Sequence, residues 1–470
     1  MIYLPIENTS RPENLNFILE IAYVSKVHRL DFSKRIVVRK TRVKYANDVG
    51  LPQPAAPRGR DSFPPVCTFL AMRHINQYTK HIQLFVDTDT RILSETTFRR
   101  IWHRCLPHIQ FMTCRTDVCH KCEIFREKIK QAVSEEDKLQ ATDEFSAHIH
   151  DAQQEREYYN ARCKAASREL AAHPVVQGPV PPMSHNLIDV HYTFDFAQSF
   201  LLPSHCRQEV GLYFRSPYKA HMFGICNDGR STQTNYIYGE DQCVGVDGNF
   251  SHSANNVISM LHHFFQTFGE GERICHLNAD NCGGQNKNQI VTSYLAWRVA
   301  NGLHEDIFLH FMKPYHARCL VDGMFGLVRR RFCQTDNDCL EDLNTTIELS
   351  SLHNKSVLYS ENKWDWRDWK TYAKTTFKAI PGIQKYQHFH FSSTFPGMVK
   401  VKTSAQSVEK SIYILKRGKT ISCVLPNSQE VGGLSSNRAW YLYRNIRPYV
   451  KDPKKYLLCP LPSIPQPESN

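Results

Sequence analysis

The order of strand-like and helix-like segments between residues 187 and 333 constrains the fold of this chain more than any other feature of its sequence. In "LIDVHYTFDFAQ" (187–198), apolar and polar residues alternate, which is typical of a β-strand. The same pattern criteria predict these further segments: strands at 211–226 and 234–240, a helix at 253–268, a strand at 273–279, a helix at 286–300, a strand at 306–312 and a helix from about 321. The predicted order is therefore β-β-β-α-β-α-β-α.

This order predicts an α/β fold. Three consecutive strands followed by alternating helices and strands give a mixed sheet with helices on both faces. The ribonuclease H-like fold has this order, and it places the first and fourth strands side by side at the centre of the sheet. We therefore expect the strands at 187–198 and 273–279 to be neighbours, with the last helix packed nearby.

Three aspartates fall at comparable places in that topology. Asp195 lies near the end of the first strand, Asp280 follows the fourth strand in "HLNADNCGGQNKNQI" (276–290), and Asp322 begins the last helix. Converging carboxylates repel one another unless a cation compensates. Such a set can hold two Mg²⁺ or Mn²⁺ ions, one to activate a water or 3′-hydroxyl and one to stabilise the leaving oxygen. Alternatively, the three acids only cap a strand, a turn and a helix.

Other acids compete for the same roles. Asp189 is an alternative to Asp195, and Asp322 has four nearby alternatives: Glu305, Asp306, Asp336 and Asp338. His316 stands six residues before Asp322. A histidine there can bind phosphate, act in proton transfer, or be a structural residue with satisfied hydrogen bonds.

Polar side chains gather directly after Asp280. Gly283 and Gly284 predict a turn into the next helix, and the residues around them supply donors near the helix N-terminus, where a phosphate backbone binds well. The predicted DNA-contacting residues are Asn281, Gln285, Asn286, Lys287, Asn288, Arg329 and Arg330. Alternatively, the amides cap and brace the turn.

The charge distribution favours a polyanionic partner. The formal net charge is +12, and basic residues are concentrated at 26–44 and 329–331. Such patches indicate nucleic acid first, although a solvated basic surface is the simpler alternative. The sequence has no run of about 18 apolar residues and no basic-then-apolar leader, so we expect neither a membrane-spanning nor a secreted protein.

The region before the strands contains a candidate zinc site. In "CRTDVCHKC" (114–122), Cys119 and Cys122 have the spacing of half a tetrahedral structural site, with Cys114 and His148 as candidates for the other half. The remaining candidates are Cys105, His120, His150 and Cys163. Plain buried thiols are the alternative. Residues 123–172 lack Gly and Pro and predict one or two long helices, either a helical hairpin or a coiled coil that could form a homo-oligomer.

Proline-rich stretches at 51–65 and 173–184 suggest domain boundaries. The predicted regions are a basic arm (1–65), a helical region with a helix-turn-helix-like stretch (66–172), the α/β core (185–345), a partly β accessory region (346–460) and a disordered tail (461–470). Within the accessory region, residues 395–450 are expected to form a small barrel.

Several segments resemble a large family of transposon-derived animal proteins. They are "DVHYTFDFAQSFLLPS", "HLNADNCGGQNKN", "SYLAWRV" and "VDGMFGLVRR", with weaker similarity over roughly residues 45–450. The resemblance implies a DDE-type, ribonuclease H-like transposase or integrase core that cuts and joins DNA, with Asp195, Asp280 and Asp322 as metal ligands. We therefore expect DNA as partner and a nuclear location.

The chain departs from the family in one place. Members often have Gly-His-Thr before the third acid, whereas this chain reads "KPYHARC" (313–319) and keeps only the histidine. Alternatively, then, this is a domesticated protein without catalytic activity, which binds nucleic acid or acts as a zinc-stabilised interaction module.

Overall fold

The computed structural model describes residues 51–53, 66–69, 94–97, 99–100, 110–111, 118–360 and 363–466. The chain divides into two compact units, residues 1–118 and 119–470. The first unit contains a three-stranded sheet of β1 (Leu51–Gln53), β2 (Val66–Phe69) and β3 (Gln110–Phe111). Cys105, Cys114 and most of the predicted basic arm lie outside the described residues.

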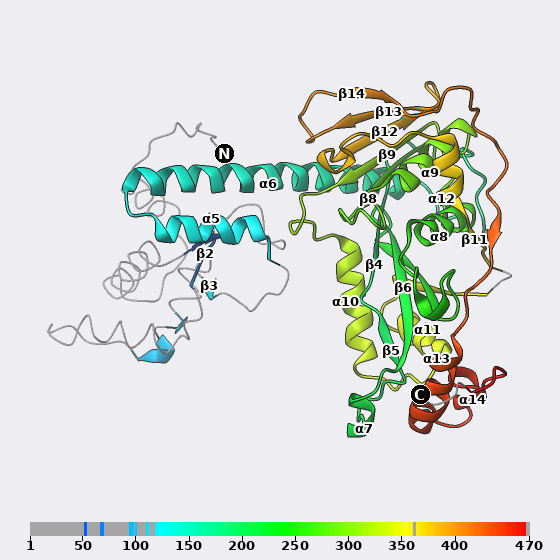
Figure 1. Ribbon diagram of the computed structural model, residues 1–470. Helices are drawn as coiled ribbons and strands as arrows, with labels where there is room; N and C mark the ends of the chain where they lie inside the picture. Colours follow the sequence, from blue (N-terminus) through cyan, green and yellow to red (C-terminus); the bar gives the residue numbers. More distant parts are fainter. Residues whose placement is uncertain are drawn as a thin grey trace. The chain divides into compact units, whose positions relative to one another are not determined.

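The second unit is built on a ten-stranded mixed sheet (Figure 1). Its strands are β4 (Val190–Phe196), β5 (Phe200–Leu202), β6 (Tyr218–Asn227), β7 (Thr232–Gly239), β8 (Ile274–Ala279), β9 (Asp306–Phe311), β10 (Asn354–Leu358), β12 (His388–Ser392), β13 (Met398–Lys402) and β14 (Lys410–Tyr413). The spatial order is β10-β7-β6-β4-β8-β9-β12-β13-β14, and β5 pairs with β6. The first and fourth predicted strands, β4 and β8, are parallel neighbours, which confirms that prediction.

Helices cover both faces of this sheet. On one face lie α6 (Glu135–Ala171), α10 (Leu320–Phe332) and α11 (Leu340–Glu348), and on the other α8 (Ala254–Thr267), α9 (Gln289–Ala300) and α12 (Trp369–Thr376). Further short elements include α7 (Val210–Tyr213), β11 (Trp366–Arg367), β15 (Ser428–Gln429), α13 (Ser436–Tyr441) and α14 (Lys455–Leu458). The sheet with helices on both faces is the α/β architecture that the sequence predicts.

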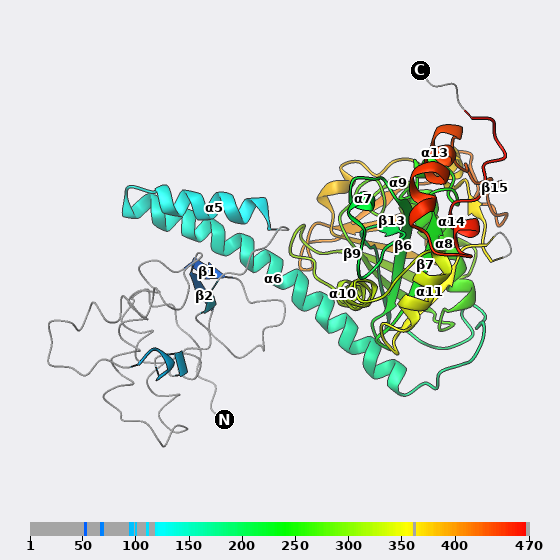
Figure 2. The same ribbon diagram turned by 90° about the horizontal axis from the view of Figure 1, so that it is seen from below.

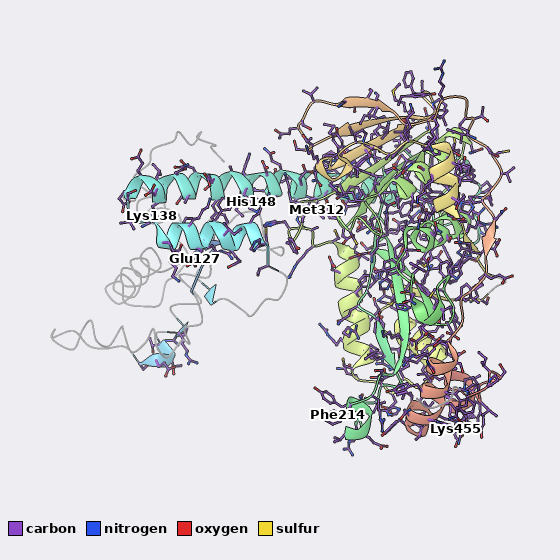
Figure 3. All side chains as sticks on the ribbon, viewed as in Figure 1. Glu127, Lys138, His148, Phe214, Met312 and Lys455 are labelled. Carbon is purple, nitrogen blue, oxygen red and sulfur yellow. The ribbon has the colours of Figure 1, made fainter. Side chains whose placement is uncertain are left out.

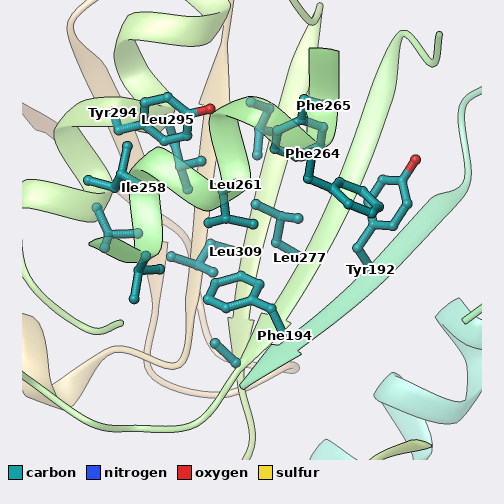
Figure 4. Packing of buried hydrophobic residues seen from close by; sticks show 14 of the residues in the cluster. Tyr192, Phe194, Ile258, Leu261, Phe264, Phe265, Leu277, Tyr294, Leu295 and Leu309 are labelled. Carbon is teal, nitrogen blue, oxygen red and sulfur yellow. The ribbon is translucent and has the colours of Figure 1, made fainter. Parts of the chain in front are cut away.

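The main hydrophobic core lies between the sheet and α8. Period-2 alternation directs Tyr192 and Phe194 of β4 and Leu277 of β8 to this side, where they meet Leu261 and Phe264 of the helix (Figure 4). Ser253 begins α8 as predicted, since its side chain accepts a hydrogen bond from Asn256 N. The apolar face of the strands, set by alternation at every second residue, and the apolar face of α8 therefore form one hydrophobic layer.

Two predictions about strands are wrong. The strand expected from residue 211 begins at Tyr218, because Pro217 lacks a donor and the residues before it form the short helix α7. The C-terminal strands do not form a separate barrel. Instead β12, β13 and β14 extend the main sheet beyond β9, and β10 extends it beyond β7. Pairing there satisfies backbone groups that β9 and β7 would otherwise expose as sheet edges.

The predicted long helices form a hairpin. α5 (His120–Gln131) lies alongside the N-terminal half of α6, and Ser134 caps α6 through Asp137 N (Figures 1 and 2). The C-terminal half of α6 packs against β4 and buries Tyr159, Ala166 and Leu170. Among the residues that the structure describes, no helix combines the length and apolar character needed to cross a membrane.

Candidate functional site

The register between β4 and β8 places two of the predicted acids together. Phe194 pairs with Ala279, so Asp195 and Asp280 are the next residues along two adjacent parallel strands. Side chains alternate along a strand, so both point away from the α8 core, toward the face covered by α6 and α10. Both side chains are partly exposed.

The third acid is brought to this point by the packing of α10. Gly224 pairs with Asp195 across β6 and β4, and the Phe325 ring occupies the space that a side chain at position 224 would take. Val328 is fully buried one turn further along α10. Asp322 lies one turn before Phe325, and its Oδ2 accepts a hydrogen bond from Cys319 N (2.7 Å). α10 therefore begins beside the ends of β4 and β8.

The pKa of Asp195 reflects both its burial and the two neighbouring acids. Burial raises the pKa of Asp195 to about 8, and the negative charges of Asp280 and Asp322 add to this increase. A hydrogen bond from Phe196 N to Asp195 Oδ1 (2.8 Å) opposes it only in part. At neutral pH the site therefore holds a proton, and a divalent cation would relieve the same repulsion.

The competing acids are engaged elsewhere. Asp189 lies at the start of β4 and forms an ion pair with Arg162 (3.0 Å). The alternatives to Asp322 pair as follows: Glu305 with Arg273, Asp306 with His390, Asp336 with Lys451 and Asp338 with His205. These alternatives are held by other partners, whereas Asp280 and Asp322 are the acids whose charges act on Asp195.

The residues after Asp280 form an internal hydrogen-bond network. Asp280 Oδ1 accepts from Cys282 N (3.2 Å) and from Asn286 Nδ2 (2.5 Å). Asn288 caps α9 by accepting from two backbone N–H groups, and it donates to Gly283 O (3.0 Å). This network fixes the orientation of the Asp280 carboxylate.

Most of the predicted DNA-contacting residues after Asp280 take part in this network, so their side chains point into the loop. Asn286 and Lys287 are buried, and Lys287 Nζ donates to Asn281 Oδ1 (2.9 Å). Asn281 in turn donates to the Met312 carbonyl at the end of β9. These side chains brace the loop in this structure. A direct contact with a phosphate backbone stays a prediction for the more exposed Gln285.

The two predicted arginines on α10 differ in their surroundings. Arg329 donates to Gln198 O (2.9 Å), and its guanidinium lies over the Phe200 ring (4.2 Å). Arg330 is exposed. Of the two, Arg330 is therefore the better placed to meet a solvent-borne polyanion.

A second cluster joins the helical hairpin to the loop before α10. The Nε2 atoms of His148 and His316 lie 3.3 Å apart, and each lies 3.5 Å from a cysteine sulfur, Cys119 for His148 and Cys122 for His316. All four side-chain donor atoms lie within 4.8 Å of one another. The structure thus adds His316 to the predicted Cys119, Cys122 and His148. The exposed His120 and His150 are not in the cluster.

The environment of His316 differs from the one expected for a catalytic histidine. Burial, followed by neighbouring His148 and Arg156, lowers the pKa of His316 to about 4. The ring is therefore neutral at physiological pH, and its contacts are with the cysteine–histidine cluster.

Sequence reasoning missed a polar layer beneath α6. Histidines at alternate positions of adjacent strands form a buried chain that ends on this helix: His276 contacts His310 (3.2 Å), His310 contacts His388 (2.9 Å), and His388 bonds to Glu155 (2.8 Å). Two further groups of potential ligands lie nearby or deeper in the core: half-buried Cys163 with buried His191 and Asp228, and the fully buried group of Glu272, Cys275 and His304. The recurring histidines within strand-like segments were the available signal.

The close approach of α10 to β6 gives a first testable prediction. A Cβ at position 224 would lie 2.6 Å from the Phe325 ring, so Gly224→Ala is expected to lower the free energy of unfolding by about 1–3 kcal/mol through overpacking. Denaturant unfolding measures this change. Gly284→Ala adds its methyl group to open space and serves as the control. Equal stability of the two variants would contradict the packing described.

One comparison with known proteins identifies a related region. A family model described as a domain of unknown function (DUF7869) matches residues 215–409. This range contains Asp280, Asp322 and His316 but begins after Asp195. No curated protein and no solved structure matches the chain.

Proposed function

We propose that this protein is a DDE-type DNA strand-transferase or endonuclease that uses two divalent metal ions, Mg²⁺ or Mn²⁺. The observation that carries the proposal is the register of β4 and β8, which places Asp195 and Asp280 at the same level of adjacent strands. Burial there, together with the charges of Asp280 and Asp322, raises the pKa of Asp195 to about 8. Hard oxygen donors at the ends of adjacent strands suit these cations better than zinc.

The topology supports the proposal independently of the acids. The central strands run in the order β7-β6-β4-β8-β9, with β6 antiparallel and β8 parallel to β4. A ribonuclease H-like core has this order, and we propose this fold for the region. The resemblance of the Asp280 motif to transposon-derived proteins points to the same class.

The chain's own residues have distinct parts in such a reaction. Bound divalent cations would supply activation of the attacking hydroxyl and stabilisation of the leaving oxygen. Asp195, Asp280 and Asp322 would hold them, and Asn286 keeps the Asp280 carboxylate oriented. Gln285 and Arg330 are proposed to contact the DNA backbone. Because DNA is the proposed substrate, we also propose a nuclear location.

A cleavage assay tests this function. The wild-type chain is expected to nick or join DNA only with Mg²⁺ or Mn²⁺, and Asp195→Asn is expected to lower the rate about 10³-fold, because metal-based stabilisation amounts to several kcal/mol. Asp189→Asn, directly before the same strand but paired with Arg162, is the matched control and should keep the activity.

Two results would count against the enzyme. Equal rates for the wild type and Asp195→Asn would refute the metal-binding role of the acids. DNA binding by the wild type without cleavage under any of these conditions would favour the second candidate, a domesticated nucleic-acid-binding protein on the same fold.

A further inference from the structure

The cysteine–histidine cluster has the dimensions of a tetrahedral metal site. Ideal tetrahedral coordination with Zn–S near 2.3 Å and Zn–N near 2.05 Å requires about 3.6 Å between sulfur and nitrogen and about 3.3 Å between two nitrogens. The corresponding distances are 3.5 Å for Cys119–His148 and for Cys122–His316, and 3.3 Å between His148 and His316. Three of the six ligand pairs therefore match these values, and the other three lie within 4.8 Å.

Hydrogen bonds within this cluster would have to be shared between partners or would leave lone pairs opposed. Each histidine Nε2 touches both a cysteine sulfur and the other Nε2, yet a neutral ring nitrogen offers either one N–H or one lone pair. If both thiols donate, two lone pairs face each other at 3.3 Å. A cation at the centre would satisfy all four groups at once.

The four ligand positions come from three separate elements. Cys119 and Cys122 stand at the start of α5, and His148 lies on α6 (Figure 3). His316 lies in the loop between β9 and α10. Apart from the cysteines, the hydrophobic cluster between α5 and α6 is small: it consists of buried Phe145 and of Phe125, Ile129 and Ile149, which are partly buried against it. A small core of this kind commonly needs a metal or a disulfide to hold it.

The loop that carries His316 leads directly to Asp322. Arg156 of α6 donates to the carbonyl oxygens of His316 and Arg318, and Asp151 forms an ion pair with Lys313 (3.3 Å). Tyr315, next to His316, has a φ of 65°, which is uncommon for a residue with a side chain and needs support from its surroundings. The cluster and Arg156 therefore anchor the residues just before α10.

We propose that Cys119, Cys122, His148 and His316 bind one structural zinc ion, which ties the α5–α6 hairpin to the β9–α10 loop and thereby positions Asp322. Nitrogen and sulfur donors in a closed set of four are the ligands of structural zinc. Only the effect on Asp322 rests on the proposed function. Zinc binding itself stands on the geometry of the four ligands.

Metal content of the purified full chain tests the zinc site. The wild type is expected to contain about one zinc ion per chain, and His316→Ala and Cys122→Ser are expected to contain almost none. The control is His150→Ala, an exposed histidine two residues from His148 on the same helix, which should keep the zinc. His316→Cys restores a ligand and should bind zinc again.

Hydrogen exchange tests the link to Asp322. Chelation of zinc is expected to speed amide exchange at residues 313–322 by at least about tenfold, with little change in the sheet. Zinc-free wild-type protein, or equal zinc in His316→Ala, would overturn the site. Unchanged exchange after chelation would overturn the anchoring of the loop.

The two proposals fail in distinguishable ways. Asp280→Asn is expected to lose DNA cleavage and keep its zinc, whereas His316→Ala loses zinc first and cleavage as a consequence. A wild-type chain that binds zinc through all four residues but never cleaves DNA would leave the zinc site standing and refute the enzyme.

Discussion

Replacing Asp280 with asparagine is expected to abolish metal-dependent DNA cleavage and, without divalent cations, to stabilise the folded protein at pH 8. Asparagine keeps the oxygen that accepts from Asn286 and Cys282 N, so the turn is preserved. The substitution removes one of the two charges that help to raise the pKa of Asp195. Activity and metal-free stability should therefore change in opposite directions, as expected for a strained functional site.

The pH dependence follows from the raised pKa of Asp195. Between its ordinary value of 3.8 and about 8, folded Asp195 keeps a proton that the unfolded chain releases. This contribution to stability is complete at low pH and is lost as pH rises through this interval, by at most about 1.4 kcal/mol per pH unit. Asp280→Asn should show a smaller total loss over a narrower pH interval, although burial still raises the pKa of Asp195.

Thermal unfolding across this pH range, with and without Mn²⁺, measures both effects. At pH 8 the cation should stabilise the wild type and have little effect on Asp280→Asn. Asp189→Asn should respond to pH and to the cation as the wild type does, since this carboxylate pairs with Arg162, although loss of the ion pair lowers its stability slightly throughout. A metal-free Asp280→Asn protein less stable than the wild type at pH 8 would show that Asp280 is a structural residue rather than one of a repelling set.

The part of the fold that the sequence predicts is the part governed by local periodicity. Alternation in β4 and the amphipathic pattern of α8 are set within each segment, and their boundaries differ little from those expected. Once β4 and β8 are neighbours in this register, Asp195 and Asp280 lie at the same level, because each directly follows a residue of the Phe194–Ala279 pair. The position of Asp322 could not be predicted from its own segment. It depends on the packing of Phe325 against Gly224, which holds α10 beside β4.

The features that the sequence did not reveal depend on distant contacts. His316 joins Cys122, 194 residues away, and no spacing rule connects them. Membership of β12 in the main sheet depends on pairing with β9 rather than on its own pattern. The composition of 123–172 predicted helices correctly, but a helix rich in charged residues conceals which of them are buried.

Removing the buried carboxylate of Glu155 is the second change with a large expected effect. Glu155 is only 2% exposed, although it lies in a helix rich in charged residues. Its oxygens accept hydrogen bonds from His388 Nε2 (2.8 Å) and Ala405 N (2.9 Å), so one side chain joins α6 to β12 and to the loop after β13. His388 continues this connection to His310.

Glu155→Ala is therefore expected to lower the free energy of unfolding by about 3–5 kcal/mol, because it leaves buried polar partners without their acceptor. Chemical denaturation measures this loss, and hydrogen exchange should show α6 opening before the sheet. Glu157→Ala is the matched control, since this neighbouring glutamate is exposed and bonds only within the helix, to Gln153 (2.9 Å). If both variants lost the same small amount, the polar layer would not be what holds α6 on the sheet.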